Sequence, residues 1–120
     1  MSAFAQEWAN HLAATNSFNH RQPNKYGENL YAISGTNLKL NGCDAVKSWY
    51  GEIKDYTYFG SNPPMSQFQK FGHFTQVVWK GTTEIGLGLA VVNGKAYVVG
   101  NYNPPGNYAG SFKENVLPTI

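Results

Sequence analysis

The sequence is poor in cysteine, in charge and in long apolar runs. Cys43 is its only cysteine, so no disulfide can form within the chain. Charged residues make up 13% of the 120 residues, about half of the usual share. The nine Lys and Arg residues are scattered singly, whereas nucleic-acid binding calls for a stripe of positive charge. We therefore expect no nucleic-acid partner. No apolar run approaches the roughly 20 residues of a membrane-spanning helix.

The chain has the length and apolar content of one compact domain, which we place at residues 1–120. Hydrophobic residues make up 42% of it, and 3 Trp, 8 Tyr and 7 Phe can fill a core. Met1 is followed directly by an amphipathic stretch, so we expect no signal peptide.

Two segments show the three- and four-residue apolar spacing of helices. The first is residues 2–16, with Ser2 as a possible cap. The second is residues 44–55, which we expect Asp44 to cap. Glu52 falls just outside the apolar arc of the second helix and is therefore predicted to be half turned toward the core.

The strongest strand signal is a hairpin at residues 83–102. Its first strand alternates large apolar residues with Gly86, Gly88 and Ala90, and Asn93-Gly94 is a preferred two-residue turn. The small residues predict a helix packed closely on that face. Residues 30–33 suggest a short strand, residues 17–29 and 56–71 read as irregular, and residues 74–79 fit either a strand or a helix.

Two imidazoles and two carboxylates stand out in so lightly charged a chain: His20, Glu28, Glu52 and His73. Three interpretations are open. The four can hold a divalent cation, act in catalysis with a glutamate as general base, or form a buried polar network without a ligand.

Two longer motifs resemble the signature motifs of the CAP superfamily. These are GHFTQVVWKGT at 72–82 and YVVGNYNPPGNY at 97–108, supported by YGENL at 26–30, SWYGEI at 48–53 and FKENVLP at 112–118. The superfamily includes cysteine-rich secretory proteins, venom allergens and plant pathogenesis-related proteins. The Golgi-associated pathogenesis-related branch, poor in cysteine, is the most similar. The motif positions are Gly72, His73, Phe74, Thr75, Gln76, Trp79, Asn101, Tyr102, Pro105, Gly106 and Asn107.

The resemblance implies an α+β fold, an α-β-α sandwich with a central antiparallel sheet flanked by helices. It also implies a short helix that begins at His73. Two features depart from the family pattern. Gly100 stands where the family usually has a cysteine, and the family's additional N-terminal helix is missing here, which would expose apolar surface and invite a homodimer.

The resemblance further implies a cavity lined by His20, Glu28, Glu52 and His73 that binds a divalent cation. We expect zinc, held weakly and reversibly, and no organic cofactor. His73 would lie in the first helical turn, where the dipole favours a neutral imidazole. We expect no enzymatic activity; the alternatives are a metal-assisted hydrolase with Glu28 or Glu52 as general base and a purely structural interaction module.

Lipid binding is the functional alternative from another class, because the family is associated with lipids, sterols and membrane surfaces. Four aromatic residues would line the groove: Tyr56, Tyr58, Phe59 and Phe71. The predicted partner is a lipid or sterol, a membrane surface or another protein. The family majority implies an extracellular location, with an intracellular, Golgi or membrane-peripheral one as the alternative.

Overall fold

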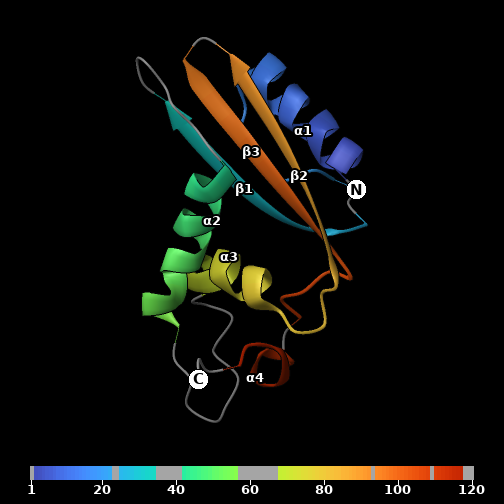
Figure 1. Ribbon diagram of the computed structural model, residues 1–120, viewed down its shortest axis with the longest axis vertical. Helices are drawn as coiled ribbons and strands as arrows, with labels where there is room; N and C mark the ends of the chain where they lie inside the picture. Colours follow the sequence, from blue (N-terminus) through green and yellow to red (C-terminus); the bar gives the residue numbers. More distant parts are fainter. Residues whose placement is uncertain are drawn as a thin grey trace.

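The computed structural model describes residues 2–22, 25–34, 42–56, 68–92, 94–108 and 110–117. Helices and strands follow in the order α1 (Ser2–Thr15), β1 (Gly27–Ser34), α2 (Gly42–Tyr50), the 3₁₀ helix η1 (Gly51–Asp55), α3 (Phe68–Val78), β2 (Glu84–Val92), β3 (Lys95–Asn103) and α4 (Phe112–Asn115) (Figure 1). In these ranges no helix has the length and apolarity to cross a membrane.

The three strands form one antiparallel sheet in the order β1-β3-β2. In the register, Gly27 faces Tyr102 across β1 and β3, and Glu84 faces Asn103 across β2 and β3. The predicted hairpin is confirmed, with two residues between its strands. Gly94 adopts a φ of 74°, which the turn requires and which glycine adopts at little cost; Asn93 lies outside the described residues.

Helix α1 lies on one face of the sheet, directly against the small residues of β2. A Cβ atom on Gly88 would lie 2.4 Å from the main-chain nitrogen of Gln6 and 2.5 Å from the carbonyl carbon of Ala5. Because side chains alternate along β2, its small residues share one face, and this lets the backbone of α1 approach the strand. The core of this layer joins α1 to the sheet through Leu12, Leu30, Tyr97 and Val99.

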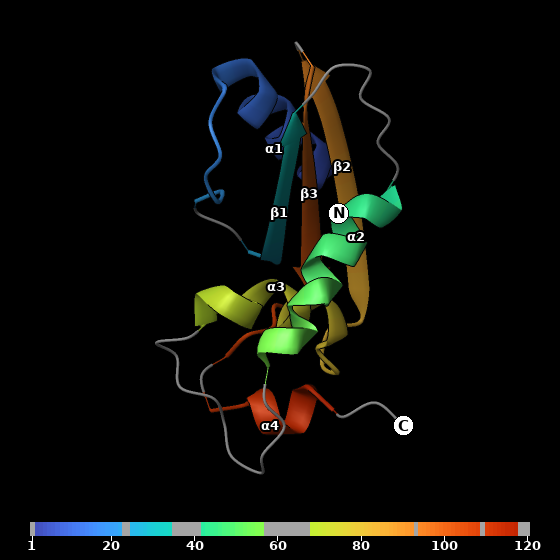
Figure 2. The same ribbon diagram turned by 90° about the vertical axis from the view of Figure 1, so that its left-hand side faces the viewer.

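Helix α2 covers part of the opposite face (Figures 1 and 2), where Ala45 and Trp49 pack on Val98. The Trp49 indole also donates to the carbonyl oxygen of Leu30 at 3.0 Å, which ties α2 to the outer edge of β1. Helices on both faces of an antiparallel sheet confirm the predicted α-β-α sandwich.

Helix α3 lies at the end of the sheet and packs on α4 through an aromatic cluster. Phe71, Trp79 and Phe112 form edge-to-face pairs in it. Such pairs add about 0.5–1.5 kcal/mol each beyond the burial of their area.

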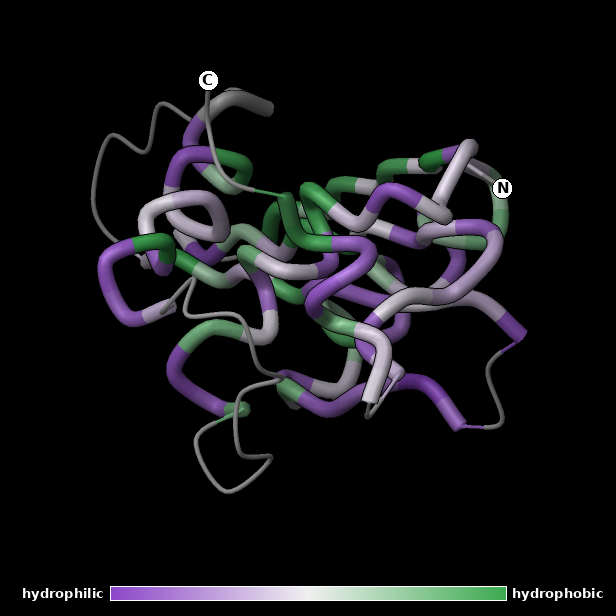
Figure 3. The backbone as a smooth tube through the Cα atoms, turned by 90° about the horizontal axis from the view of Figure 1, so that it is seen from below, coloured by the Kyte–Doolittle hydropathy of each residue, from purple (hydrophilic) through white to green (hydrophobic). Residues whose placement is uncertain are grey.

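In the hydropathy-coloured trace the turns at the periphery are mainly hydrophilic (Figure 3).

One apolar stripe is left uncovered on the α2 side of the sheet. Its residues point away from α1 and are 41% to 55% exposed: Ile85, Leu87, Leu89 and Val91. The predicted homodimer stays a prediction.

The element boundaries correct four expectations. Asp44 is the third residue of α2 rather than its cap, where its charge still favours the helix N-terminus. The second α-helix ends at Tyr50, and the rest of the predicted segment, residues 51–55, forms the 3₁₀ helix η1. Strand β1 is longer than predicted and includes residues 27–29. Helix α3 settles the ambiguity at residues 74–79 but begins at Phe68, not at His73.

The contact at Gly88 predicts a strong effect of one added methyl group. Gly88→Ala forces α1 away from β2, because main-chain atoms cannot rotate aside. We expect the free energy of unfolding to fall by about 1–3 kcal/mol or more, measured by urea denaturation. Gly51→Ala is the matched control, since nothing lies within 4 Å of a Cβ atom there. Equal stability of the two variants would contradict the packing described.

Candidate functional site

His73 is held by Glu52 through both its main chain and its ring. The His73 amide donates to Glu52 Oε1 at 2.9 Å, and Nδ1 lies 2.8 Å from Oε2. The Phe74 amide also donates to Oε1, at 3.3 Å. A carboxylate only accepts, so Nδ1 carries the proton and Nε2 is left for a ligand. Glu52 is half-buried, as its place beside the apolar arc predicted.

His20 and Glu28 form a second pair of the same kind. His20 Nδ1 lies 2.9 Å from Glu28 Oε1, which also accepts the Arg21 amide at 3.0 Å. The Glu28 side chain is 4% exposed and the His20 side chain 59%. The buried carboxylate therefore orients an accessible ring, and again Nε2 is turned to other partners.

The irregular segment that carries His20 is fastened to α1. The Arg21 guanidinium donates to the Phe4 carbonyl oxygen at 3.2 Å and to Glu7 at 2.8 Å. It also lies over the Phe4 ring, 3.8 Å from its centroid, in a cation–π contact. The Trp8 indole donates to the Asn19 carbonyl oxygen at 2.9 Å. These contacts hold the loop in place, although it contains no helix or strand.

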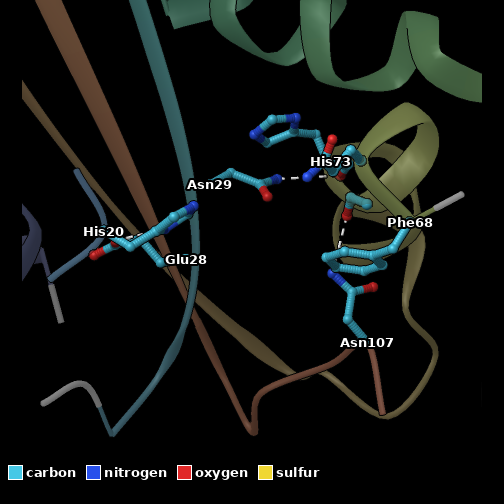
Figure 4. Close-up of a pocket in the computed structure, with 8 residues that line it drawn as sticks. His20, Glu28, Asn29, Phe68, His73 and Asn107 are labelled. Atoms are coloured by element: carbon cyan, nitrogen blue, oxygen red, sulfur yellow. Dashed lines mark hydrogen bonds and ion pairs between the residues drawn. The ribbon is translucent and has the colours of Figure 1, made fainter. Parts of the chain in front are cut away.

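The two pairs meet around the outer edge of β1. Successive strand residues point to opposite faces, so Glu28 and Asn29 lie on different sides of the sheet. Because β1 is an edge strand, a cavity of about 240 Å³ can extend past it from one side to the other. Figure 4 shows this cavity, which is lined by His20, Glu28, Asn29, Phe68, Gln69, Gly72, His73 and Asn107.

Three of the four predicted site residues line this cavity, whereas Glu52 lies behind His73. Within the described ranges, no three His, Cys, Asp or Glu side chains are grouped to hold a metal ion. The four predicted ligands stay a prediction, and the structure pairs each of the two imidazoles with its own glutamate. His73 is the sixth residue of α3 and does not lie in the first helical turn, where it was expected.

The two signature motifs are joined by side-chain hydrogen bonds. The Thr75 hydroxyl donates to Asn107 Oδ1 at 2.5 Å, and Asn107 Nδ2 donates to the Gly72 carbonyl oxygen at 2.9 Å. Gln76 accepts the Gly106 amide at 3.0 Å. These bonds hold the turn after β3 against α3 and bring Asn107 to the cavity. The remaining motif residues are buried or half-buried: Phe74, Trp79, Asn101, Tyr102 and Pro105.

Two of the four residues assigned to the predicted lipid groove lie in the core. Tyr56 and Phe71 are buried in the aromatic cluster beneath α3, with ring centroids 5.3 Å apart. Core packing explains both residues. Tyr58 and Phe59 lie outside the described residues.

Three cavity residues, Asn29, Phe68 and Gln69, were missed from the sequence. Asn29 follows Glu28 directly, and strand alternation predicts opposite faces for the two. Only the knowledge that β1 is an edge strand could have placed both at one cavity. Phe68 and Gln69 fall in the first turn of α3, within a segment that was read as irregular.

Tyr102 lies beneath the cavity and is kept neutral. Burial raises the pKa of its hydroxyl to about 12, while the hydrogen bond from Asn29 acts in the opposite direction. Asn29 Nδ2 donates to this hydroxyl at 3.2 Å and to the His73 carbonyl oxygen at 3.1 Å. The floor of the site is thus a neutral network that joins β1, β3 and α3.

Comparison with known proteins identifies the family. The model of the cysteine-rich secretory protein family, CAP, matches residues 1–102. This chain belongs to the CAP family. PRY2 of Saccharomyces cerevisiae is 39% identical over 98% of the chain, and Golgi-associated plant pathogenesis-related protein 1 of Homo sapiens is 34% identical over 95%.

A crystal structure of NaASP2 with Zn²⁺ has the same fold as this CAP chain, with a TM-score of 0.72 and 28% identity. The structural alignment covers 89% of this chain and 60% of the NaASP2 chain. The chain spans 33% of the length of PRY2 and 73% of that of the human relative. Family and fold follow from these matches, whereas the activities of the whole relatives do not.

The neutral Tyr102 predicts a loss of stability in alkali. Below about pH 10 both the folded and the unfolded chain keep this proton. Between pH 10 and about 12 the unfolded chain releases it first, so the free energy of unfolding falls by up to about 1.4 kcal/mol per pH unit. Denaturant titrations should show a smaller fall for Tyr102→Phe. Parallel pH curves for the two proteins would be inconsistent with a buried, protonated Tyr102.

Proposed function

We propose that this CAP chain binds a divalent cation, zinc above all, through Nε2 of His20 and Nε2 of His73. The observation that carries the proposal is the pair of His–Glu contacts at one cavity, each made through Nδ1. Metal-binding histidines typically donate their other ring nitrogen to a carboxylate, which orients the ring and makes the free nitrogen more basic.

The chemistry of the donors favours zinc. Neutral imidazole nitrogen is a good ligand for zinc and related transition metals, and a poor one for magnesium or calcium. The crystal structure of NaASP2 with Zn²⁺ supports this choice by analogy. Two imidazoles leave coordination positions for water or another ligand, which accounts for weak and reversible binding.

Cation binding without catalysis is the function that the site supports best. Glu28 Oε1 accepts two donors, and the two oxygens of Glu52 accept three. These contacts favour a role for both carboxylates in orienting histidines over that of a general base in a metal-assisted hydrolase. A lipid, sterol, membrane or protein partner stays a prediction, as does an extracellular location with the Golgi as its alternative.

Calorimetric titration with zinc tests the proposal. The parent chain should bind one zinc ion, and both His20→Ala and His73→Ala should lower the affinity at least about tenfold. Protons compete with the cation for imidazole nitrogen, so the affinity should also fall as the solution is made acidic.

The third histidine offers a matched control. His11 is exposed on α1 and stacks on Trp8, with ring centroids 4.5 Å apart, away from the residues that line the cavity. His11→Ala should bind zinc like the parent. If His73→Ala also kept the affinity of the parent, the assignment of the site would be wrong.

A further inference from the structure

Asn29 is a cavity residue whose amide orientation can be deduced. Its side chain lies between the His20–Glu28 pair and His73 in the close-up (Figure 4). Its Nδ2 is 3.1 Å from the His73 carbonyl oxygen. A carbonyl oxygen only accepts, so the amide nitrogen, with its hydrogens, must be on that side. The amide cannot be turned over without setting two oxygens against each other.

The other branch of the amide is therefore an oxygen available to a ligand. Both hydrogens of Nδ2 are used, on His73 and on the Tyr102 hydroxyl. Within the described part of the chain, no donor is bonded to Asn29 Oδ1, and the one buried side-chain atom without a partner is Asn101 Oδ1. Asn29 is 2% exposed and lines the cavity, so Oδ1 is the side-chain atom that it can present there.

We propose that Asn29 Oδ1 is a third ligand atom for the cation, beside Nε2 of His20 and Nε2 of His73. This inference rests on the proposed function and adds to it a residue outside the His/Glu set. Two imidazole nitrogens and one oxygen make the three-ligand set of an open zinc site, with a position left for water. Strand β1 supplies the oxygen from a rigid element, on which Tyr102 and the His73 carbonyl hold the amide in place.

A structural role alone makes a different prediction. In that case the amide only holds the His73 carbonyl oxygen and Tyr102, and any substitution that breaks this hold weakens the site. Asn29→Asp breaks it, because a carboxylate cannot donate to a carbonyl oxygen. The same change presents a negatively charged oxygen to the cation. The two roles therefore predict opposite effects of Asn29→Asp on zinc affinity.

The experiment is calorimetric zinc titration of the full chain and two variants at neutral pH. We expect Asn29→Ala to weaken zinc binding about tenfold or more. We expect Asn29→Asp to strengthen it about threefold or more, because charged ligands raise cation affinity. Asn10→Asp is the charge control: it adds the same charge on an exposed position of α1 and should leave the affinity within about twofold of the parent. Weaker binding in both Asn29 variants, or no change in either, would overturn the proposal.

A second measurement uses the parent protein alone, so it tests the proposal even if an Asn29 variant does not fold. In the labelled parent protein, the ¹³C resonance of the Asn29 side-chain carbonyl should move when zinc is added. A resonance that stays in place while zinc binds would refute Asn29 as a ligand and leave the two histidines standing. Absence of zinc binding by the parent would remove the proposed function and this inference together. Weaker binding in His20→Ala and His73→Ala, with the affinity of the parent kept in both Asn29 variants, would remove only the inference.

Discussion

The edge position of β1 is the constraint on which the site depends. A strand inside a sheet presents its two faces to separate layers, and residues on those faces cannot share a cavity. At the edge, the cavity can pass around the strand, so Glu28 from the α1 side and Asn29 from the other side reach it together. The rest of the fold supplies one His–Glu pair to each side of this edge.

Each layer fixes its own histidine by a different means. On one side, α1 packs against Gly88 without intervening side chains and fastens the His20 segment through Arg21. On the other side, α2 leads into the 3₁₀ turn that carries Glu52, and Glu52 grips His73 by ring and main chain. The geometry of the cavity is therefore set by packing on both faces of the sheet, which explains why its residues are spread from residue 20 to residue 107.

Local patterns predicted most of the fold, because they report interactions near in sequence. The alternation in β2, the Asn-Gly turn and the apolar spacing of α1 each gave the right element. Boundaries failed where a tertiary contact decided them: α3 starts five residues before His73 within an aromatic cluster that no local period reveals.

The family resemblance gave three of the residues that line the cavity through the His/Glu set, but not how the set is arranged. Spacing cannot show that Glu52 stands behind His73 rather than beside it, since that depends on how η1 meets α3. The sequence did not place Asn29 at the site, because residues 17–29 read as irregular and the cavity reaches both faces of β1 only at the edge of the sheet. Tyr56 and Phe71 were expected to line a groove, but both are buried in the aromatic core.

The central claim is that two glutamates turn two imidazoles so that both Nε2 atoms face one cavity. Two-bond ¹H–¹⁵N correlation spectra of the histidine rings, recorded at about pH 8 where imidazole is neutral, test this most directly. The predicted result is a proton on Nδ1 in both His20 and His73, with zinc shifting the Nε2 resonances of these two rings and leaving His11 unchanged. A proton on Nε2 in either ring, or zinc shifts confined to other residues, would contradict the account.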